Sequence, residues 1–291
     1  MHPAPSVILF SSLSGLGFGL MAWLGLGLPA VTGWSAFAFY FIAYALAVGG
    51  LMASAFHLAN PRNAPKAFTQ WRTSWLSREA WVSVIALLVV AGHAIGTIFF
   101  ATRLASLGAL GSALALGTVL TTAMIYTQLR TVPRWNQAAT PVLFLMLALA
   151  GGALLAGQIR IALPLLLLAG LVQLAHWHIG DRRAKQPAST RASATGLGHI
   201  GDVRLFEPPH TGTNYLMREM VHEIGRKHAI SMRVLTILLM VALPTILLSL
   251  PFNHWIVGLA ALSHLTGTIS SRWLFFAEAE HAVGLYYGKG T

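Results

Sequence analysis

The sequence has no cysteine and few charged residues, and these two features exclude several classes of protein and of metal centre. Without cysteine it forms no disulfide and supplies no thiolate to zinc or to an iron–sulfur cluster. It also carries no covalently attached c-type haem, so any such centre must belong to another subunit. Charged residues make up 9% of the chain, against about 25% in soluble domains. An ordinary soluble protein is therefore excluded.

Hydrophobic residues make up 56% of the 291 residues and gather in long runs. Each run has about the 20 residues that a helix needs to cross roughly 30 Å of hydrocarbon. We predict an all-α integral membrane protein, an eight-transmembrane-helix bundle that forms a single membrane domain over residues 1–291. The predicted spans are residues 8–28, 37–56, 80–102, 104–126, 138–156, 161–175, 234–250 and 255–277.

The 19 Lys and Arg residues are distributed unevenly between the two sides of this arrangement. One side carries 17 of them, while the other carries only Arg103 and Arg160. Because cytoplasmic loops are enriched in Lys and Arg, both termini and the loop over residues 180–232 are expected to be cytoplasmic. Within that loop, residues 185–201 read as a loose linker, and residues 214–229 predict a helix. That helix is either an interfacial or docking element or a solvated linker helix.

The densest polar cluster joins the end of the second span to the start of the third, at the edge of the bilayer. Glu79 stands at the lip of an apolar helix, where a carboxylate is costly unless it is paired or placed at a helix N-terminus that Ser77 would cap. His57 adds a second titratable group. A quinone needs groups that exchange protons, and a histidine with a carboxylate supplies this chemistry, although the same pair could form a buried structural bond. Three tryptophans fit an aromatic belt: Trp71, Trp75 and Trp81.

Several other histidines lie in or near the predicted spans, namely His93, His176, His178 and His264. Two such histidines on different helices could ligate one b-type haem. A single histidine on an apolar helix more often bonds across to a neighbouring helix. At the end of the last span, Arg272 is expected to pair with one of the acids that follow it, Glu278 or Glu280.

Five short segments together resemble the signature of a known family. They are His-Leu-Ala-Asn-Pro-Arg at 57–62, Trp-Arg-Thr-Ser-Trp-Leu-Ser-Arg-Glu at 71–79, Asn-Tyr-Leu-Met-Arg-Glu-Met at 214–220, Arg-Lys-His at 226–228 and Arg-Trp-Leu-Phe-Phe-Ala-Glu at 272–278. This pattern is similar to that of dimethyl sulfoxide reductase-type membrane anchor subunits, and the resemblance covers essentially the whole chain.

The resemblance implies a subunit that does not itself convert the substrate but anchors a molybdopterin catalytic subunit and an iron–sulfur subunit, and exchanges electrons with ubiquinone or menaquinone. Molybdopterin and the clusters would belong to the partners, with no haem or metal in this chain and no nucleic acid bound. The matching positions place the quinone near His57 and Glu79, together with Trp75, Ser77 and Arg78. Partner docking is assigned to Arg62, Lys66, Arg72, Arg218, Arg226 and Lys227.

Topology divides this family. In enteric-type dimethyl sulfoxide reductases the catalytic subunits face the periplasm, whereas in sulfite:quinone oxidoreductases they face the cytoplasm. The charge distribution puts the signature loop inside, and residues 1–7 are similar to the start of sulfite-oxidising anchors. We therefore expect an anchor for sulfite oxidation in a bacterial inner membrane. The alternatives are the anchor of an S- or N-oxide reductase that oxidises quinol, and a transporter, which predicts broken helices and polar residues near the bilayer midplane.

Overall fold

The computed structural model describes residues 2–56, 60–186, 189–207, 212, 214, 217, 220 and 228–287, and all regular elements in these ranges are helices. The long ones are α1 (Pro5–Gly25), α2 (Gly33–Ala55), α3 (Trp75–Phe99), α4 (Ala105–Thr127), α5 (Ala139–Leu155), α6 (Ile159–Lys185) and α11 (His254–Ala277). Another long helix is made of α9 (Ala229–Ile237), the π-helical η3 (Leu238–Ala242) and α10 (Leu243–Leu248). The short ones are η1 (Pro61–Phe68), α7 (Arg191–Thr195) and η4 (Ala282–Tyr287).

Six of these helices are long and apolar enough to cross a membrane: α1, α2, α3, α4, α6 and the combined helix over residues 229–248. The other two predicted spans are also occupied by helices. The 17-residue α5 is apolar but shorter, and α11 contains His254, His264 and Arg272 among its apolar residues. The prediction of a helical membrane protein is confirmed.

Two helices extend well beyond the predicted spans, and both extensions contain polar residues. α3 begins at Trp75 rather than at residue 80, so Glu79 lies in its second turn and not at its lip. α6 continues to Lys185, ten residues past the predicted end, because Asp181 in its last turns forms ion pairs with neighbouring segments. The loop predicted over residues 180–232 is correspondingly shorter, between Lys185 and Ala229.

The predicted linker and loop helix have different outcomes. Among the described residues of the predicted linker 185–201, residues 191–195 form α7, whose N-terminus is closed by a capping box between Thr190 and Ser193. The helix predicted over residues 214–229 lies mostly outside the described residues, and α9 begins at Ala229.

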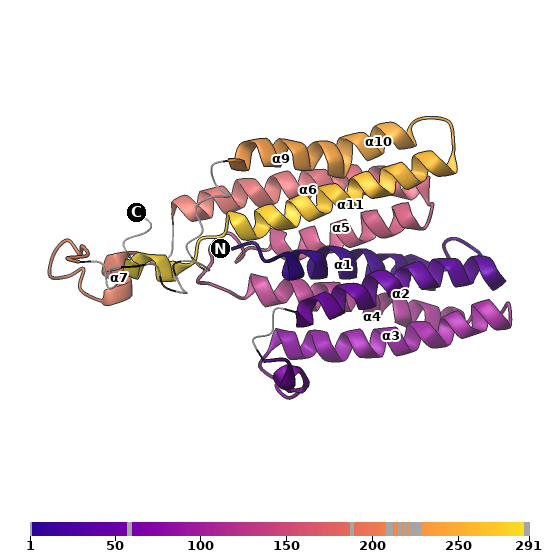
Figure 1. Cartoon of the computed structure of the whole chain (residues 1–291), viewed down its shortest axis with the longest axis horizontal. Helices are drawn as coiled ribbons and strands as arrows, with labels where there is room; N and C mark the ends of the chain where they lie inside the picture. The colour runs from indigo at the N-terminus through magenta and orange to yellow at the C-terminus, as the bar shows by residue number, and fades with distance from the viewer. Residues whose placement is uncertain are drawn as a thin grey trace.

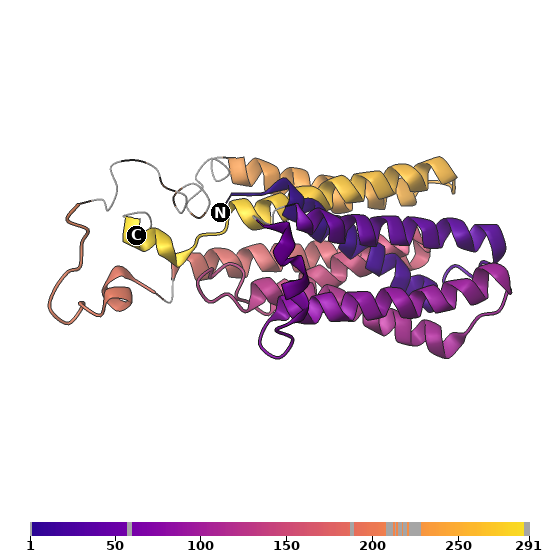
Figure 2. The same ribbon diagram turned by 60° about the horizontal axis from the view of Figure 1, so that its bottom comes forward.

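The long helices run side by side along an elongated bundle, with α1 near its middle (Figures 1 and 2). α1 packs against α2, α4 and α5 and also touches α11. The start of α1 and η4 lie toward the same end of the bundle. That end also carries residues 60–74, the connection 128–138 and the last turns of α6 and α11, and we call it the basic end.

Glycine sets the distance between the central helices. A Cβ atom on Gly152 of α5 would meet the backbone carbonyl of Gly19 and the backbone nitrogen of Leu20 in α1. On the other side of α1, a Cβ on Gly17 would meet the backbone of Ala47 in α2. In a membrane, where lipid is as apolar as the side chains, such close approach supplies the packing that holds helices together.

The interruption in the seventh long helix, at η3, has an identifiable cause. Pro244 has no N–H. It therefore cannot bond the carbonyl of Met240, four residues earlier, as in an α-helix, or that of Leu239, five residues earlier, as in a π-helix. His264 Nδ1 lies 2.8 Å from the carbonyl oxygen of Met240, and the hydroxyl of Ser263 donates to that of Leu239 at 2.7 Å. α11 thus satisfies the freed carbonyls inside the bundle, as backbone groups at membrane depth require.

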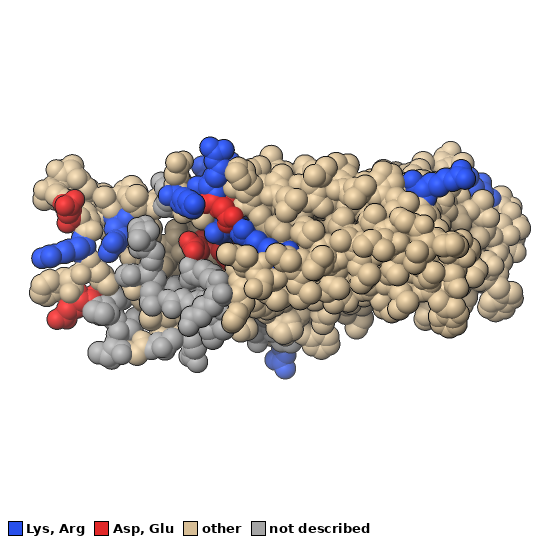
Figure 3. Space-filling view, turned by 90° about the horizontal axis from the view of Figure 1, so that it is seen from above, with Lys and Arg blue, Asp and Glu red and all other residues tan. Residues whose placement is uncertain are grey.

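Charge is concentrated at the ends of the molecule. Figure 3 shows Lys and Arg gathered at the basic end and a smaller group at the opposite end, with no charged residue on the face between them. The opposite end holds the connection between α3 and α4, which contains Arg103, and the start of α6, which contains Arg160. Arg103 donates to the carbonyl of Leu26, which ties this connection to the end of α1.

Candidate functional site

The loop that precedes α3 is folded back onto the first turns of that helix at the basic end. Asn60 accepts a hydrogen bond from the N–H of Arg62 at 3.1 Å and so starts η1. The indole of Trp81 donates to the carbonyl of Phe68 at 3.0 Å, and the two rings meet edge to face at 5.4 Å. This fold leaves three of the predicted docking side chains exposed to solvent: Arg62, Lys66 and Arg72.

Three residues that were predicted to bind quinone hold this loop in place. Arg78 donates from Nε to the carbonyl of Trp71 at 3.0 Å and from Nη2 to that of Arg72 at 2.8 Å. Its guanidinium lies 4.3 Å from the ring centroid of Trp75. The hydroxyl of Ser77 accepts from the N–H of Gln70 at 3.2 Å. The prediction that Ser77 caps α3 was wrong, because Ser74 is the N-cap residue and Ser77 lies inside the helix.

Glu79 points into the bundle rather than toward the loop. Its side chain is 4% exposed, and its Oε1 accepts a hydrogen bond from the hydroxyl of Thr122 on α4. Thr122 is itself buried and also donates to the carbonyl of Thr118. Among the described residues Glu79 has this one hydroxyl partner. A carboxyl group in an apolar bundle can hold and release a proton.

A second polar side chain is buried at a similar depth on α11. Arg272 is 2% exposed, and its guanidinium carbon lies 3.5 Å from the ring centroid of Phe144. Arg272 and Thr122 line the same small cavity, together with Ser11, Ser12 and Ser14 of α1. The expected ion pair between Arg272 and an acid at the end of α11 is absent among the described residues, because Glu278 binds Arg233 instead.

Aromatic rings fill the space beside this cavity. The indole of Trp135 stacks on Phe275 at 5.1 Å and donates to the carbonyl of the same residue at 2.7 Å. Tyr126 contacts both rings edge to face and also lies 5.9 Å from Phe144. These rings connect α4, α5 and α11 and shield the buried arginine from the surface.

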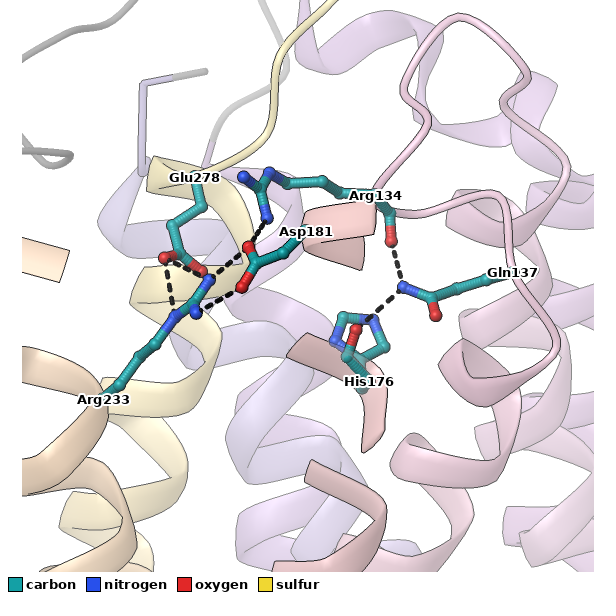
Figure 4. Close-up of polar contacts among 6 residues, drawn as sticks. All are labelled: Arg134, Gln137, His176, Asp181, Arg233 and Glu278. Carbon is teal, nitrogen blue, oxygen red and sulfur yellow. Dashed lines mark hydrogen bonds and ion pairs between the residues drawn. The ribbon is translucent and has the colours of Figure 1, made fainter. Parts of the chain in front are cut away.

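A cluster of ion pairs joins α6, α9 and the end of α11 at the basic end (Figure 4). Arg233 binds Asp181 at 2.7 and 2.8 Å and Glu278 at 2.8 and 2.9 Å. Arg134, from the connection between α4 and α5, binds Asp181 as well. Burial raises the pKa of Glu278 above its usual value, while the nearby Arg233 opposes this shift. The cluster fastens four segments that the sequence separates widely.

The buried histidines bond to neighbouring segments, as the simpler of the two sequence interpretations predicts. His176 Nε2 lies 3.3 Å from the hydroxyl of Thr140, and Gln137 donates to the carbonyl of His176 at 3.2 Å. His93 Nδ1 lies 3.1 Å from the carbonyl oxygen of Leu104, and His264 contacts η3 through the carbonyl of Met240. His178 is exposed. In the described part of the chain, no three His, Asp or Glu side chains come together as metal ligands would.

The structure brings together some of the predicted site residues and leaves others outside its description. Trp75, Ser77, Arg78 and Glu79 share the start of α3. His57, Arg218, Arg226 and Lys227 lie outside the described residues. Sequence reasoning missed Thr122, because a threonine in an apolar run gives no signal of what faces it. It also missed the pairing of Asp181 with Arg134 and Arg233. The available signal was the acidic Asp181 directly before two arginines at the end of an apolar run.

Known proteins match the chain over most of its length. Residues 34–278 match the family model described as DMSO reductase anchor subunit (DmsC). A protein of Allochromatium vinosum, named as a subunit of sulfite dehydrogenase, is 33% identical over 330 aligned positions, which cover 99% of each chain. No solved structure matches. The resemblance inferred from the short segments is confirmed, and this multi-pass membrane protein belongs to the family of DMSO reductase anchor subunits.

Proposed function

We propose that this chain is the membrane anchor and quinone-reactive subunit of a three-subunit molybdoenzyme that oxidises sulfite to sulfate. The observation that carries the proposal is the similarity to the sulfite dehydrogenase subunit of Allochromatium vinosum over the whole length of both chains. An iron–sulfur subunit would pass electrons from the molybdopterin subunit to a quinone in the membrane. This chain, which has no cysteine, would hold neither the clusters nor the molybdopterin.

In the proposed topology all eight long helical segments cross a bacterial inner membrane, with both termini in the cytoplasm. Two observations support it. The 19 Lys and Arg residues divide 17 to 2 between the two sides, and helix ends with Lys and Arg gather at the basic end. With 17 residues, α5 lies at the lower limit of the length that spans a membrane. Its packing against the central helix α1 makes this short length tolerable. The whole chain then forms one membrane domain.

The quinone would bind at the basic end, near His57 and the start of α3. Bound there, a quinone supplies two-electron chemistry coupled to the uptake of two protons. The buried carboxyl of Glu79 fits the role of proton donor, since it is screened from lipid and its partner among the described residues is a single hydroxyl. Ser77 and Arg78 would shape the site by fixing the loop, and the ring of Trp75 would form one wall.

The iron–sulfur subunit would dock on the basic end, because positively charged side chains there steer an acidic partner surface and fix its orientation. The proposed contacts are Arg62, Lys66, Arg72, Arg218, Arg226 and Lys227. Docking on this end brings the partner's clusters to the same side as Glu79.

A second candidate is the anchor of an S- or N-oxide reductase, in which electrons run from quinol to the catalytic subunit. The description of the matching family favours it. The same site would then accept protons from quinol rather than donate them to quinone.

The test starts from the complex purified with a tag on this chain in mild detergent. We expect two larger subunits with stoichiometric molybdenum and iron, and sulfite-dependent reduction of a soluble quinone analogue. Quinol-dependent reduction of dimethyl sulfoxide without sulfite oxidation would select the second candidate. A chain that elutes alone and free of metal would refute both.

Glu79→Gln tests the site itself. Losing a positioned proton donor should lower quinone turnover about a hundredfold or more while the complex still assembles. The matched control is Glu207→Gln, which removes an exposed carboxylate of the loop after α7. Equal turnover in the two variants would remove Glu79 from the mechanism.

A further inference from the structure

The guanidinium of Arg272 is buried without enough partners to satisfy it. Among the described residues, neither its Nε nor its Nη1 has a hydrogen-bond acceptor, although both atoms are removed from solvent. The ring of Phe144 offsets part of the cost, since an aromatic face attracts a cation. A guanidinium keeps its charge in proteins, so it still requires acceptors for the donors that remain.

The cavity beside Arg272 offers such acceptors only through a bridging molecule. It measures about 10 Å³, close to the room that one water molecule needs. The hydroxyl of Ser12 faces the same cavity and, within the described chain, has no partner either. On the α4 side the cavity is lined by Thr122, whose hydroxyl binds Glu79. Unpaired donors and hydroxyls around a space of this size are the conditions under which buried water is found.

The groups around the cavity lie at one level of the bundle. By a helix rise of about 1.5 Å per residue, Ser12 lies about 10 Å inside the start of α1 and Arg272 about 8 Å inside the end of α11. Thr122 lies about 8 Å inside the end of α4 by the same rise. All three helix ends are at the basic end. The titratable groups that face this region are Glu79 of α3, Tyr126 of α4 and Arg272, with His176 of α6 within electrostatic range of Arg272.

We infer that the cavity holds ordered water that bridges Arg272 to Thr122 and Glu79, and that Arg272 is a positioning residue for the proton that Glu79 exchanges. The inference rests on the proposed quinone site. Reduction of a quinone takes up two electrons, supplied by sulfite through the partner's iron–sulfur clusters, and two protons. One proton leaves the carboxyl of Glu79, and the other enters from the cytoplasm. The carboxylate that remains is stabilised by the water-bridged guanidinium until it too regains a proton from the cytoplasm.

Infrared spectroscopy of the purified complex tests this coupling without relying on turnover. The C=O stretch of protonated Glu79 is assigned as the band that Glu79→Gln removes, and it is followed against pH. In Arg272→Gln the acid form should persist to higher pH by about one unit, a tenfold shift in equilibrium. Arg272→Lys, which keeps the charge, should shift it less. The matched control Arg160→Gln removes an exposed cation at the opposite end and should change nothing.

Ser12→Ala keeps the test decisive if the Arg272 variants do not assemble. A cavity without water gains from this change, because an unsatisfied buried hydroxyl is removed, whereas a hydrated cavity loses a hydrogen bond. We therefore expect Ser12→Ala to lower the melting temperature and to broaden the Glu79 band. An unchanged titration in Arg272→Gln, or a rise in melting temperature in Ser12→Ala, would overturn the coupling. If Glu79→Gln loses quinone turnover while Arg272→Gln leaves the titration unchanged, the coupling fails and the proposed function stands. If Glu79→Gln keeps its turnover, the proposed quinone site itself fails.

Discussion

The contact between α1 and α5 makes a sharp prediction about a single methyl group. Gly152→Ala places a Cβ against the carbonyl of Gly19 and the backbone nitrogen of Leu20. These are backbone atoms, so no side chain can rotate away and the two helices must separate. Because α1 also packs on α2 and α4, that movement would disturb the middle of the bundle.

The size of the effect follows from two opposing contributions. Alanine in place of glycine inside a helix stabilises by about 0.5–1 kcal/mol. Overpacking typically costs about 1–3 kcal/mol, and a clash with backbone lies at the upper end. Gly152→Ala should therefore be destabilising by about 2 kcal/mol. Gly49→Ala in α2 is the matched control, since nothing lies within 4 Å of its Cβ position, and it should be neutral or slightly stabilising.

The assay is unfolding of the detergent-solubilised chain in mixed micelles of increasing dodecyl sulfate content, followed by far-ultraviolet circular dichroism. Gly152→Ala should unfold at a clearly lower dodecyl sulfate fraction than the parent chain, and Gly49→Ala at the same or a higher fraction. If the two variants unfold together, the close approach of α1 and α5 does not hold the bundle, and the reasoning from glycine packing fails.

Further predictions concern the ion-pair cluster and the interruption before α10. Arg233→Leu removes the cation that Asp181 and Glu278 share, and should cost about 2–3 kcal/mol, less than for a fully buried pair because Asp181 is partly exposed and keeps Arg134. Burial raises the pKa of Glu278, and the loss of its cation in Arg233→Leu raises that pKa further. The loss of unfolding free energy should therefore be smallest near pH 4 and grow as pH rises through the pKa of Glu278. A loss that shrinks with rising pH would contradict this account. His264→Phe should cost about 1–3 kcal/mol by leaving a buried carbonyl unsatisfied. Adding Pro244→Ala, which restores an N–H, should recover part of that loss in the same unfolding assay, and strictly additive effects would argue against the shared carbonyl.

The sequence alone determined that this is a helical membrane protein, and it located a helix in each of eight ranges. Length and hydropathy suffice for this, because a helix must satisfy its own backbone in lipid. The five short segments between residues 57 and 278 together also indicated the family, which the comparisons confirm.

Tertiary structure decided which polar groups meet. Hydropathy ended the sixth span at residue 175, but the ion pairs of Asp181 with Arg134 and Arg233 extend α6 to Lys185. Arg272 was expected to pair with an acid near it in sequence, yet it faces Phe144 and a cavity between helices. Such contacts depend on how each helix is rotated about its axis. In apolar helices with little amphipathic pattern, that rotation is set by the close packing of small residues across the interfaces, which no single segment of sequence contains.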